Sequence, residues 1–355
     1  MRIDFAISSL RTGGGERVLA TIANNLVNRG NTVRVITFSE PIEYETHSKI
    51  ELVKLHSGSF KNQTLRYIIK LYKYYKNKNN RPDVIISFMT QTSLSVILVA
   101  KLLGIKVIAS EHTSHIRTST HKGVVNFTRK YIYRLANYVT ILTKFDKEFY
   151  KKHGANAVVL PNPCSFKKIN TPKENKDKII LAVGALHKYH IKGFDNLLPI
   201  VQPILHKHKD WKLMIVGETK NEGYPFLKNL AKDLKIENQV IFTGLRNDVK
   251  DIMANSEIFV LSSRNEGLPM VLLEAMSQDM CCIAFDCISG PSDIITNNVN
   301  GILIENQNYT EMTKVLTHLI ETPELRLKLS SKANTITAKF NEDLICDKWE
   351  DLIKN

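Results

Sequence analysis

The chain has 355 residues, which is too long for one ordinary hydrophobic core and favours two domains of about 150 to 180 residues each. Hydrophobic residues make up 43% and charged residues 24%, a composition that excludes disordered and fibrous proteins. The five cysteines form no C-x-x-C pair, so the sequence predicts neither a disulfide framework nor a zinc site and is typical of a reducing compartment. No apolar run reaches about 18 residues, and the first residues are interpreted as a β-strand instead of a signal peptide, so we expect no membrane-spanning segment.

Positive charge is concentrated in the first half of the chain. Residues 1–165 contain 25 Lys and Arg against 10 Asp and Glu, a net charge of +15, whereas residues 166–355 contain 24 against 25, a net charge of −1. Much of the excess lies in two segments rich in tyrosine and aliphatic residues, Lys61 to Arg81 and Arg117 to Leu135. Basic, aromatic helices of this kind bind anionic bilayers or phosphate-bearing partners, although a solvated helix face explains the pattern equally well. Nucleic acid is a third partner for so basic a chain, but we find no motif for it.

Short apolar runs alternate with helical patterns through the first half. The runs predict strands, and apolar residues three or four apart predict helices between several of them. This alternation indicates βαβ units and a parallel sheet that is covered on both faces. The expected strands are 2–7, 32–38, 83–88, 106–110, 138–142 and 157–162, and the expected helices lie near 16–29, 65–78 and 92–103.

A second α/β rhythm follows residues 160–178, a stretch rich in proline, asparagine and lysine that is interpreted as a linker. Strands are expected at 179–184, 212–217, 239–244, 258–263, 281–286 and 301–305. The first three end in glycine, at Gly184, Gly217 and Gly244. Because ligands bind beyond the carboxyl ends of strands in an open α/β sheet, these glycines mark positions where a ligand can approach the backbone, unless they serve only as tight turns.

One segment after a predicted strand, "RNEGLPMVLLE" at 264–274, carries two carboxylates. Glu266 lies in a Glu-Gly-Leu-Pro turn, and Glu274 follows eight positions later, about two turns into a predicted helix. The first amides of that helix have no intrahelical acceptor and carry partial positive charge, which makes them a site for phosphate. Carboxylates accept hydrogen bonds from paired hydroxyl groups such as those of a ribose or a hexose. The segment therefore predicts a site for a ligand with both phosphate and sugar groups.

The longer stretch "SSRNEGLPMVLLEAMSQDMCCIAFDCISGPSDII" resembles the nucleotide-binding signature of the retaining glycosyltransferases of family 4, the glycosyl transferases group 1. Three further stretches agree with that family in the expected order: "GGGERVLATIANNL", "ASEHTS" and "VGALHKYHIKGFDNLL". The resemblance covers nearly the whole chain. It implies an α/β protein with the GT-B fold, in which two Rossmann-like parallel-sheet domains face each other across a cleft. Residues 1–165 would bind the acceptor, residues 172–340 would bind the nucleotide sugar, and a last helix at 341–355 would pack back on the first domain.

The family pattern assigns roles to residues of the second domain. Glu274 is expected to bind the ribose hydroxyls, Glu266 the hydroxyls of the transferred sugar, and Lys192 the diphosphate. Backbone groups of the turn and the following helix would contact sugar and diphosphate, at Gly267, Leu268, Pro269, Met270 and Val271. The nucleotide would lie against backbone near Gly184, Gly217, Gly244 and Leu245.

One residue of the family pattern is missing. An arginine usually follows the glycine at the end of the first strand of the second domain, where this chain has Ala185. Lys188 is the substitute that we expect, and His187 is the other candidate. No D-x-D motif occurs and the histidines show no metal spacing. We therefore expect no metal, and no cofactor besides the nucleotide sugar, which is a co-substrate.

The first domain contributes a glycine loop and a histidine to the implied site. The loop would face the cleft at a place where side chains would block the ligand, and it consists of Gly13, Gly14 and Gly15. His112 matches the family histidine near the reacting sugar carbon. The implied catalytic residues are His112, Lys192 and Glu266.

Each of these residues also has a structural interpretation. A lone histidine is more often part of a core than of a site, and a lysine at a helix start is often only a surface residue. Glu16 and Arg17 are suited to cap the first helix and complement its dipole, and their catalytic role stays open. Cys281 and Cys282 lie in a predicted buried strand and are expected to be core residues.

The resemblance implies an enzyme that moves a sugar from a nucleoside-diphosphate donor with retention of the anomeric configuration. A UDP-hexose or UDP-N-acetylhexosamine is the donor that the family uses most often. A basic first domain without a spanning helix fits a peripheral enzyme at the cytoplasmic face of an anionic membrane. It would extend a saccharide on a polyisoprenoid lipid during capsule, lipopolysaccharide or glycan assembly. Two other classes remain: a non-catalytic sugar-nucleotide or polyanion-binding protein, which Ala185 favours, and a nucleic-acid-binding protein, which the net charge of +14 favours.

Overall fold

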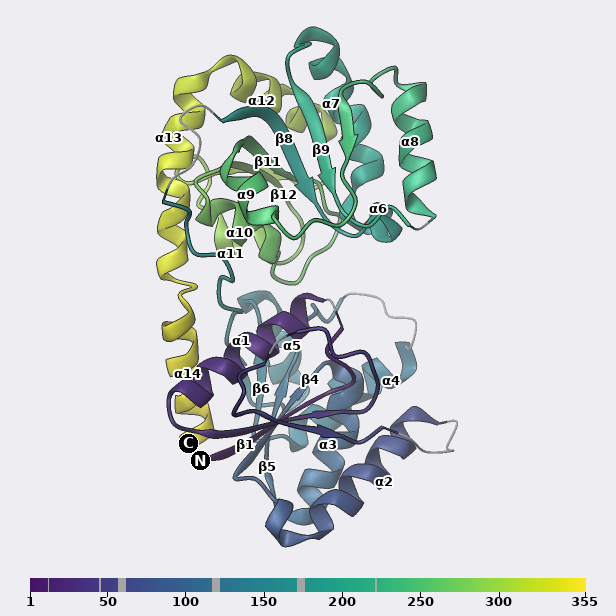
Figure 1. Ribbon diagram of the computed structural model, residues 1–355, viewed down its shortest axis with the longest axis vertical. Coiled ribbons are helices and arrows are strands. Elements are labelled where there is room, and N and C mark those ends of the chain that lie inside the picture. Colours follow the sequence, from purple (N-terminus) through teal and green to yellow (C-terminus); the bar gives the residue numbers. More distant parts are fainter. Residues whose placement is uncertain (12, 45, 57–61, 117–121, 171–175, 221) are drawn as a thin grey trace. The chain divides into compact units, whose positions relative to one another are not determined.

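The chain folds into two units, each built around one parallel β-sheet (Figure 1). The computed structural model describes residues 1–11, 13–44, 46–56, 62–116, 122–170, 176–220 and 222–355. The first unit contains Met1–Ser165 together with Asn341–Asn355, and the second contains Phe166–Phe340. Lys61 and residues 117–121 of the two basic segments, and residues 171–175 of the expected linker, lie outside the described residues. The prediction of two parallel-sheet domains is confirmed.

In the described part of the first unit, seven strands form the sheet. They are β1 (Arg2–Ile7), β2 (Thr32–Thr37), β3 (Glu51–Lys54), β4 (Val84–Phe88), β5 (Lys106–Ser110), β6 (Tyr138–Ile141) and β7 (Ala157–Val159). Their order across the sheet is β3-β2-β1-β4-β5-β6-β7, and all neighbouring pairs are parallel. Almost every residue of the central strands is buried, because helices cover both faces of the sheet.

The helices of the first unit divide between the two faces of its sheet. They are α1 (Gly14–Asn28), α2 (Gln63–Lys76), α3 (Thr90–Leu103), α4 (Lys122–Phe127), α5 (Lys147–Lys152) and α14 (Glu342–Lys354). Short turns of 3-10 helix are η1 (Lys78–Asn80), η3 (Tyr133–Leu135) and η4 (Lys144–Asp146), and η2 (Thr128–Ile132) is a turn of π-helix. Helices α1 and α14 pack on one face, and α2, α3 and α5 pack on the other. Successive residues of one strand, such as Phe5 and Ala6, therefore belong to different cores.

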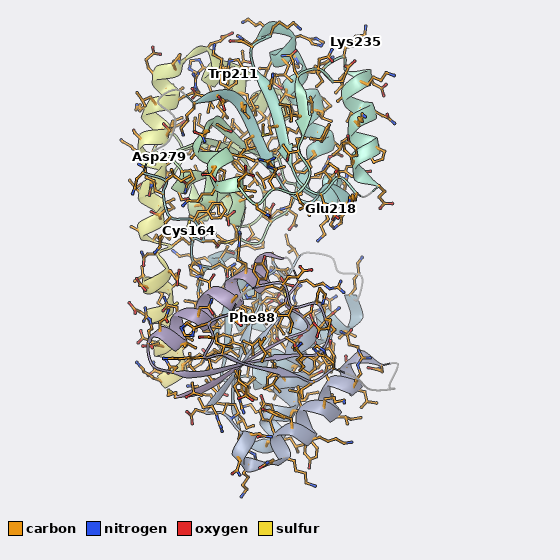
Figure 2. The ribbon with its side chains drawn as sticks, in the orientation of Figure 1. Phe88, Cys164, Trp211, Glu218, Lys235 and Asp279 are labelled. Carbon is orange, nitrogen blue, oxygen red and sulfur yellow. The ribbon has the colours of Figure 1, made fainter. Side chains whose placement is uncertain are left out.

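The last helix, α14, belongs to the core of the first unit, although the second unit separates them in sequence. Its Trp349 is 2% exposed and stacks on Phe88, which ends β4 and is labelled in Figure 2, with ring centroids 6.5 Å apart. Arg29, just after α1, forms an ion pair of 2.5 Å with Asp347 of α14. Apolar packing and charge pairing thus join the end of the chain to its beginning.

Two details of the first unit differ from the sequence prediction. The prediction omits β3, because its four residues are mostly exposed at a sheet edge and no apolar run marks them. Gly14 and Gly15, which were expected in a loop, are the first two residues of α1, and Gly13 is its N-cap. Glu16 stabilises this start, because a carboxylate in the first turn complements the helix dipole.

In the described part of the second unit, six strands form the sheet. They are β8 (Asp177–Val183), β9 (Lys212–Val216), β10 (Val240–Phe242), β11 (Ser256–Leu261), β12 (Cys281–Asp286) and β13 (Ile302–Glu305). Their order is β10-β9-β8-β11-β12-β13, again with parallel neighbours. Each of the six expected strands is found, and Cys281 and Cys282 are buried core residues of β12.

Helices of the second unit follow its strands. They are α6 (Tyr189–Lys192), α7 (Phe194–Lys207), α8 (Gly223–Asp233), α9 (Val249–Ala254), α10 (Met270–Ser277), α11 (Pro291–Ile294), α12 (Tyr309–Glu321) and α13 (Pro323–Ala333), with 3-10 turns η5 (Leu186–Lys188) and η6 (Asn334–Ala338). Part of the expected linker is bound to this unit. Gln278, just after α10, accepts a hydrogen bond from Ile169 N at 3.0 Å and donates one to the carbonyl of Lys167 at 3.2 Å.

Candidate active site

The order of the second sheet reverses between β8 and β11. From β8 the chain runs outward to β9 and β10, and then it returns to β11 on the other side of β8. Ligands of open α/β sheets bind beyond the carboxyl ends of the strands at such a point. Lys192 lies in the segment after β8, and Glu266 lies in the segment after β11. The topology therefore brings two of the expected site residues to one place.

Lys192 and Glu266 form an ion pair. Lys192, the last residue of α6, donates a hydrogen bond from Nζ to Glu266 Oε1 at 2.8 Å. Ser263 Oγ donates to the same oxygen at 2.7 Å. Both charged side chains are mostly buried, with 22% of Lys192 and 11% of Glu266 exposed. The residue expected to bind the diphosphate is thus in contact with the residue expected to bind the sugar.

The turn that carries Lys192 packs tightly against the end of β11. Gly193 has a φ of +68°, which favours glycine, and a Cβ atom there would lie 1.9 Å from the carbonyl oxygen of Ser262. Ser262 Oγ donates to the carbonyl of Lys192 at 2.9 Å. Because only glycine permits this approach, Gly193 is what allows the lysine to reach Glu266.

Arg264 fastens the same turn. Its backbone N–H donates to the carbonyl of Ile191 at 2.9 Å, and its guanidinium donates to the carbonyl of His190. The guanidinium also pairs with both carboxylate oxygens of Asp195, at 2.7 and 3.0 Å. Burial lowers the pKa of Arg264, but the hydrogen bond and charge of Asp195 outweigh it and raise the pKa above its ordinary value. Sequence reasoning missed Arg264, and the signal available was its place two residues before Glu266.

The Glu-Gly-Leu-Pro turn leads directly into α10. Leu268 is buried, and Pro269 is the N-cap of the helix, so the helix begins four residues after Glu266 and its first amides have no intrahelical acceptor. The carbonyl of Gly267 accepts a hydrogen bond from Ser289 Oγ at 3.0 Å, which supports the turn from behind. Met270 and Val271 are the first two residues of α10 and are half-buried.

Glu274 is the fifth residue of α10, a little more than one turn from its start, whereas the sequence prediction placed it two turns in. Its side chain is 2% exposed, so the carboxylate lies in the interior of the second unit. Just before Glu266, the Oδ1 atom of Asn265 is buried and has no hydrogen-bond partner among the described residues. An unpaired buried acceptor of this kind fits a hydroxyl or amide donor of a ligand.

The strand-end glycines have packing reasons of their own. Gly217 donates from N to the carbonyl of Gly244 at 3.2 Å, and a Cβ atom on Gly217 would lie 2.0 Å from the carbonyl oxygen of Gly184. A Cβ atom on Gly184 would lie 3.3 Å from side-chain atoms of Lys192. Backbone packing therefore requires glycine at Gly217 whether or not a nucleotide binds there, whereas a Cβ atom on Gly184 would be crowded only by side-chain atoms. Leu245, which follows Gly244, is 71% exposed.

Both candidates for the replacement of the family arginine lie in one short turn. Ala185 is the N-cap of the short turn η5, and Lys188 is the last residue of that turn. His187 and Lys188 are both exposed. Both lie in the segment after β8 that also carries Lys192.

The first sheet has its own reversal, between β1 and β4. The segment after β1 carries the three glycines, and Met89 follows β4 with a φ of 71°. A Cβ atom on Gly15 would lie 2.4 Å from Met89 Cε and 3.9 Å from His112 Cγ. A Cβ atom on Gly14 would meet nothing within 4 Å. The predicted glycines and the predicted histidine of the first unit thus lie together.

His112 follows the end of β5. Its ring stacks on Phe88, with centroids 4.7 Å apart and an angle of 22° between the rings. Nε2 lies 3.0 Å from Ser110 Oγ, whereas Nδ1 is buried and has no partner among the described residues. Burial lowers the pKa of His112 to about 4, and the charge of Glu111 offsets only part of this effect. The imidazole is therefore neutral at pH 7.

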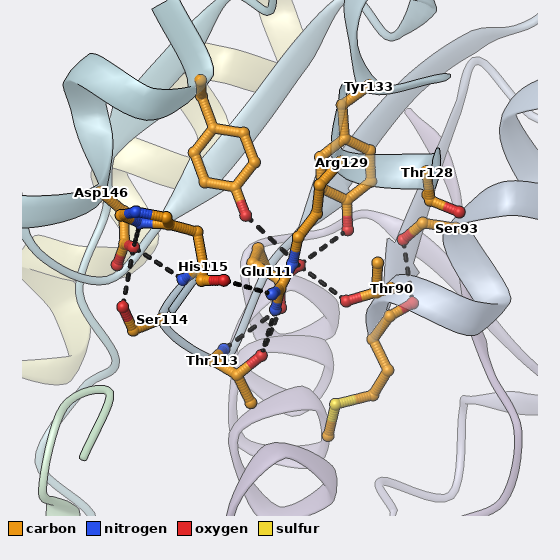
Figure 3. A network of polar contacts seen from close by, with 12 residues as sticks. Thr90, Ser93, Glu111, Thr113, Ser114, His115, Thr128, Arg129, Tyr133 and Asp146 are labelled. Atoms are coloured by element: carbon orange, nitrogen blue, oxygen red, sulfur yellow. Dashed lines mark hydrogen bonds and ion pairs between the residues drawn. The ribbon is translucent and has the colours of Figure 1, made fainter. Parts of the chain in front are cut away.

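Glu111 is the centre of a buried polar network next to His112 (Figure 3). It accepts hydrogen bonds from Arg129 Nε at 3.2 Å, Thr90 Oγ1 at 2.7 Å, Thr113 Oγ1 at 2.8 Å and Tyr133 OH at 3.1 Å. Burial raises the pKa of Glu111, but the charge and hydrogen bonds of Arg129 outweigh it and hold the pKa below its ordinary value. The charged carboxylate is thereby stabilised inside the protein.

The carboxylate of Asp146 holds the other end of the loop at residues 111–115, which follows β5 (Figure 3). Asp146 accepts from Ser114 Oγ at 2.9 Å, from His115 N at 2.8 Å and from His115 Nδ1 at 2.5 Å. Arg129 Nη1 donates to the carbonyl of His115 at 3.1 Å. Residues 111–115 are therefore fixed on both sides of His112.

Sequence reasoning missed this network. Arg129 was counted in a basic segment that was interpreted as binding a bilayer or a phosphate-bearing partner, or as a solvated helix face. It is 2% exposed and pairs with Glu111, so none of these interpretations holds for this residue. One feature of the sequence could have indicated the network: Glu111 is an acidic residue that comes directly after a buried strand in a basic domain. Because a buried carboxylate needs a positive partner, a nearby arginine had to be buried with it.

Two features are absent from the residues that the structure describes. None of their His, Cys, Asp and Glu side chains gather in threes where they could hold a metal ion. No helix among them combines the length and the apolar character needed to cross a membrane.

Comparison with known proteins adds to this geometry. Residues 12–166 match the family described as Glycosyltransferase Family 4, and residues 165–335 match the family described as Glycosyl transferases group 1. An uncharacterized glycosyltransferase of Haemophilus influenzae is 31% identical over 360 residues, which cover 99% of each chain. The amylovoran biosynthesis glycosyltransferase AmsD of Erwinia amylovora is 30% identical over 96% of each chain. A third relative, from Campylobacter jejuni, is 26% identical over 99% of this chain and 98% of its own, and is named GalNAc-alpha-(1->4)-GalNAc-alpha-(1->3)-diNAcBac-PP-undecaprenol alpha-1,4-N-acetyl-D-galactosaminyltransferase.

Solved structures share the fold of the whole chain. Sucrose-phosphate synthase from Thermosynechococcus elongatus has a TM-score of 0.83 at 14% identity, over 99% of this chain and 98% of its own. HepE of Anabaena, solved in complex with UDP, has a TM-score of 0.78 at 17% identity over 100% of both chains. At these identities the likeness shows the fold alone, whereas the sequence relatives cover nearly the full length at about 30%. The chain therefore belongs to the family 4 glycosyltransferases, among the glycosyl transferases group 1, and has the GT-B fold.

Proposed function

We propose that this glycosyltransferase moves a hexose or an N-acetylhexosamine from a UDP-sugar to a saccharide acceptor, with retention of configuration and without a metal ion. The observation that carries the proposal is the contact of 2.8 Å between Lys192 and Glu266 at the reversal point of the second sheet. Glu274 lies on the helix that begins at the same place. A cation, a sugar-binding carboxylate and free helix amides are the groups that a nucleoside-diphosphate sugar needs.

In the proposed donor complex each group has one task. Glu274 accepts hydrogen bonds from the ribose hydroxyls, and Glu266 accepts them from hydroxyls of the transferred sugar. Lys192 and the first amides of α10 balance the charge of the diphosphate, so no metal is required for that purpose. The nucleotide is assigned as UDP because HepE, which shares the fold, was solved with UDP bound.

The proposed reaction breaks the bond between the anomeric carbon and the donor phosphate. Negative charge grows on the departing phosphate, and Lys192 with the helix amides stabilises it from fixed positions. The acceptor hydroxyl attacks from the side of the leaving group, and the leaving phosphate takes the acceptor proton. Glu266 and Glu274 hold hydroxyl groups in this scheme, in contrast to the acid and base carboxylates of a glycosidase.

The acceptor is proposed to be a saccharide on a polyisoprenoid diphosphate, used in the synthesis of a surface polysaccharide or glycan. The relatives support this class, because one is named for amylovoran biosynthesis and another for an undecaprenol-linked acceptor. Such an acceptor requires the enzyme to work at the cytoplasmic face of a membrane. We therefore propose a peripheral position on that face.

An exposed surface of the first unit supports the membrane position. Helix α3 packs against α2 and against α4, and the exposed apolar residues of the three helices, with one from η2, are Leu65, Tyr72, Leu98, Leu102, Val124, Phe127 and Tyr131. Exposed lysines on the same elements are Lys73, Lys76, Lys101, Lys122 and Lys130. The unit as a whole has 27 Lys and Arg against 15 Asp and Glu, a net charge of +12. Apolar side chains among lysines are suited to an anionic lipid surface.

Liposome binding tests the membrane proposal. The protein should sediment with anionic vesicles at low salt and dissociate from them at high salt. It should not bind vesicles of neutral lipid. Phe127→Ser with Tyr131→Ser should weaken binding, whereas Leu327→Ser, which removes a 70% exposed leucine of the second unit, should not. Equal binding to neutral vesicles, or none to anionic ones, would refute the proposal.

Thermal stability tests the donor proposal. Unfolding is measured with UDP, GDP, ADP and CDP, with and without magnesium, for the native protein and for Glu274→Ala. At a hundred times its dissociation constant the favoured nucleotide should add about 2.7 kcal/mol. We expect UDP to stabilise the native protein without magnesium, and we expect most of this stabilisation to be lost in Glu274→Ala. If no nucleotide stabilises the native protein, the proposed donor site is wrong.

A further inference from the structure

Two buried hydroxyl groups lie behind His112 in the first sheet. Ser110 is the last residue of β5 and Thr140 lies in β6, and the two are paired in the register of these neighbouring strands. Each is 2% exposed. Thr140 Oγ1 lies 2.9 Å from Ser110 Oγ, which in turn lies 3.0 Å from His112 Nε2. The three polar groups therefore form a chain that ends at the imidazole.

The protons of this chain can run in two directions; a third arrangement, in which Ser110 accepts from both Thr140 and Nε2, leaves both the Ser110 proton and Nδ1 unpaired. A hydroxyl has one proton, and a neutral imidazole has one nitrogen that donates and one that accepts. In the first direction Thr140 donates to Ser110, Ser110 donates to Nε2, and His112 has its proton on Nδ1. In the second direction His112 donates from Nε2 to Ser110, Ser110 donates to Thr140, and Nδ1 has no proton.

The surroundings favour the first direction. Ser110 is the single hydrogen-bond partner of Thr140 Oγ1 among the described residues. In the second direction the buried proton of Thr140 has no acceptor, and His112 Nδ1 is also without a partner. In the first direction Nδ1–H alone is left unpaired. Since an unpaired buried polar group is costly, the direction with fewer of them is preferred.

The ring is held in place and uncharged. It stacks on Phe88 with ring centroids 4.7 Å apart, and a Cβ atom on Gly15 would lie 3.9 Å from His112 Cγ and 2.4 Å from the methyl group of Met89. Burial lowers the pKa of His112 to about 4, so at neutral pH the ring has one proton. A methionine chain is flexible and can move aside when a ligand arrives.

We propose that Ser110 and Thr140 are positioning residues that hold His112 as the neutral tautomer with its proton on Nδ1, which donates a hydrogen bond to an oxygen of a bound substrate. The identity of the ligand rests on the proposed function, whereas the tautomer does not. His112 in this role makes a hydrogen bond and transfers no proton. The acceptor proton goes to the leaving phosphate, as in the proposed reaction.

Nuclear magnetic resonance of the full-length protein with ¹⁵N-labelled histidine tests the tautomer directly. Couplings from the ring nitrogens to the two carbon-bound ring protons distinguish Nδ1–H from Nε2–H, and His112→Gln identifies the His112 signals. We expect Nδ1–H in the native protein at pH 7. A native spectrum with the proton on Nε2 would overturn the proposal without any use of enzyme activity.

Three variants test the hydroxyl chain. Ser110→Ala should shift His112 toward Nε2–H, and Thr140→Val should give a mixture of the two tautomers. Ser87→Ala is the matched control, because Ser87 is also buried in this sheet but bonds to Ser93 Oγ, at 2.9 Å. It should leave the His112 signals unchanged. A native-like His112 spectrum in Ser110→Ala, or in Thr140→Val, would show that the hydroxyl concerned does not set the tautomer.

Transfer kinetics then connect the tautomer to the reaction. In Ser110→Ala we expect kcat to fall at least about tenfold with an unchanged KM for the nucleotide sugar, whereas Ser87→Ala should keep the native kcat. A Ser110→Ala enzyme with the shifted tautomer and native kcat would refute the role in the reaction. If no donor gives transfer at all, the proposed function fails, and the magnetic resonance result still decides the tautomer.

Discussion

Lys192 and Glu266 lie 74 positions apart in sequence and join Nζ to Oε1 at 2.8 Å. In the proposed function one binds the diphosphate and the other binds the sugar, so the free protein pairs two groups that the donor would engage separately. The carboxylate keeps the lysine oriented and partly neutralised until a diphosphate takes its place. Donor binding is then an exchange of one anion for another at Lys192.

This exchange predicts opposite effects of two substitutions on UDP binding. Lys192→Met removes the cation, and UDP affinity should fall about tenfold to a hundredfold, because a hydrogen bond to a charged group contributes about 1.5 to 3 kcal/mol. Glu266→Gln removes the competing anion, so UDP affinity should be retained or increased while the transfer rate falls at least about tenfold. Isothermal titration and a transfer assay measure both effects. Loss of UDP binding in Glu266→Gln as large as in Lys192→Met would contradict the exchange.

Gly193→Ala should cost more stability than a glycine substitution at a similar φ elsewhere. The left-handed conformation costs an alanine about 1 to 2 kcal/mol, and the contact with Ser262 adds about 1 to 3 kcal/mol of overpacking. Gly104→Ala is the control, since Gly104 also has a φ of +68° but nothing lies within 4 Å of a Cβ atom there. Calorimetry gives both values. If both variants lose the same free energy of unfolding, the backbone near Ser262 can move away from the added Cβ atom without a loss of stability.

Arg129→Met should destabilise the first unit by about 3 to 5 kcal/mol, because it leaves the buried carboxylate of Glu111 without its positive partner. Adding Glu111→Gln should recover part of the loss. Arg134→Met, which removes an exposed arginine from the same segment, should change stability by less than about 0.5 kcal/mol. Denaturant unfolding measures all three. If Arg129→Met behaves like Arg134→Met, the network contributes little to stability.

The half-buried His112 predicts that the stability of the protein depends on pH in the acid range. The pKa of His112 is about 4 in the folded protein against an ordinary value of 6.5, so between these pH values the unfolded chain binds more protons. Stability from this group is complete above pH 6.5 and is lost as pH falls through 4, by about 3 kcal/mol in total. His112→Asn should remove that part of the slope between pH 6.5 and 4, whereas substitution of the exposed His187 should not. An unchanged slope in His112→Asn would show that other groups cause the acid loss.

Most of the fold could be predicted because the strands are buried on both faces and are therefore apolar throughout. β3 escaped the prediction for the opposite reason, since an exposed edge strand has no apolar run. The Glu-Gly-Leu-Pro turn could be placed at a strand end from local pattern alone. The ion pair between Lys192 and Glu266 could not, because periodicity gives the elements but does not give the contacts between segments far apart in sequence.

The burial of Arg129 illustrates a second limit. Counting charges treats every basic residue of a segment alike, yet Arg129 is buried whereas Lys122, Lys130 and Arg134 of the same segment are exposed. The difference depends on a turn of π-helix at Thr128–Ile132 and on the carboxylate of Glu111, which follows β5. Neither leaves a regular signal in the sequence.

The place of α14 has a consequence for the order in which the protein is made. The ribosome delivers residues 1–165 first, but one face of their sheet is incomplete until Ile345, Trp349 and Ile353 have been added. The second unit is continuous in sequence and can close its core while the first still waits for its last helix. The half of the chain that is synthesised earlier is therefore the half that finishes folding later, and its uncovered apolar face is what a nascent-chain chaperone would meet.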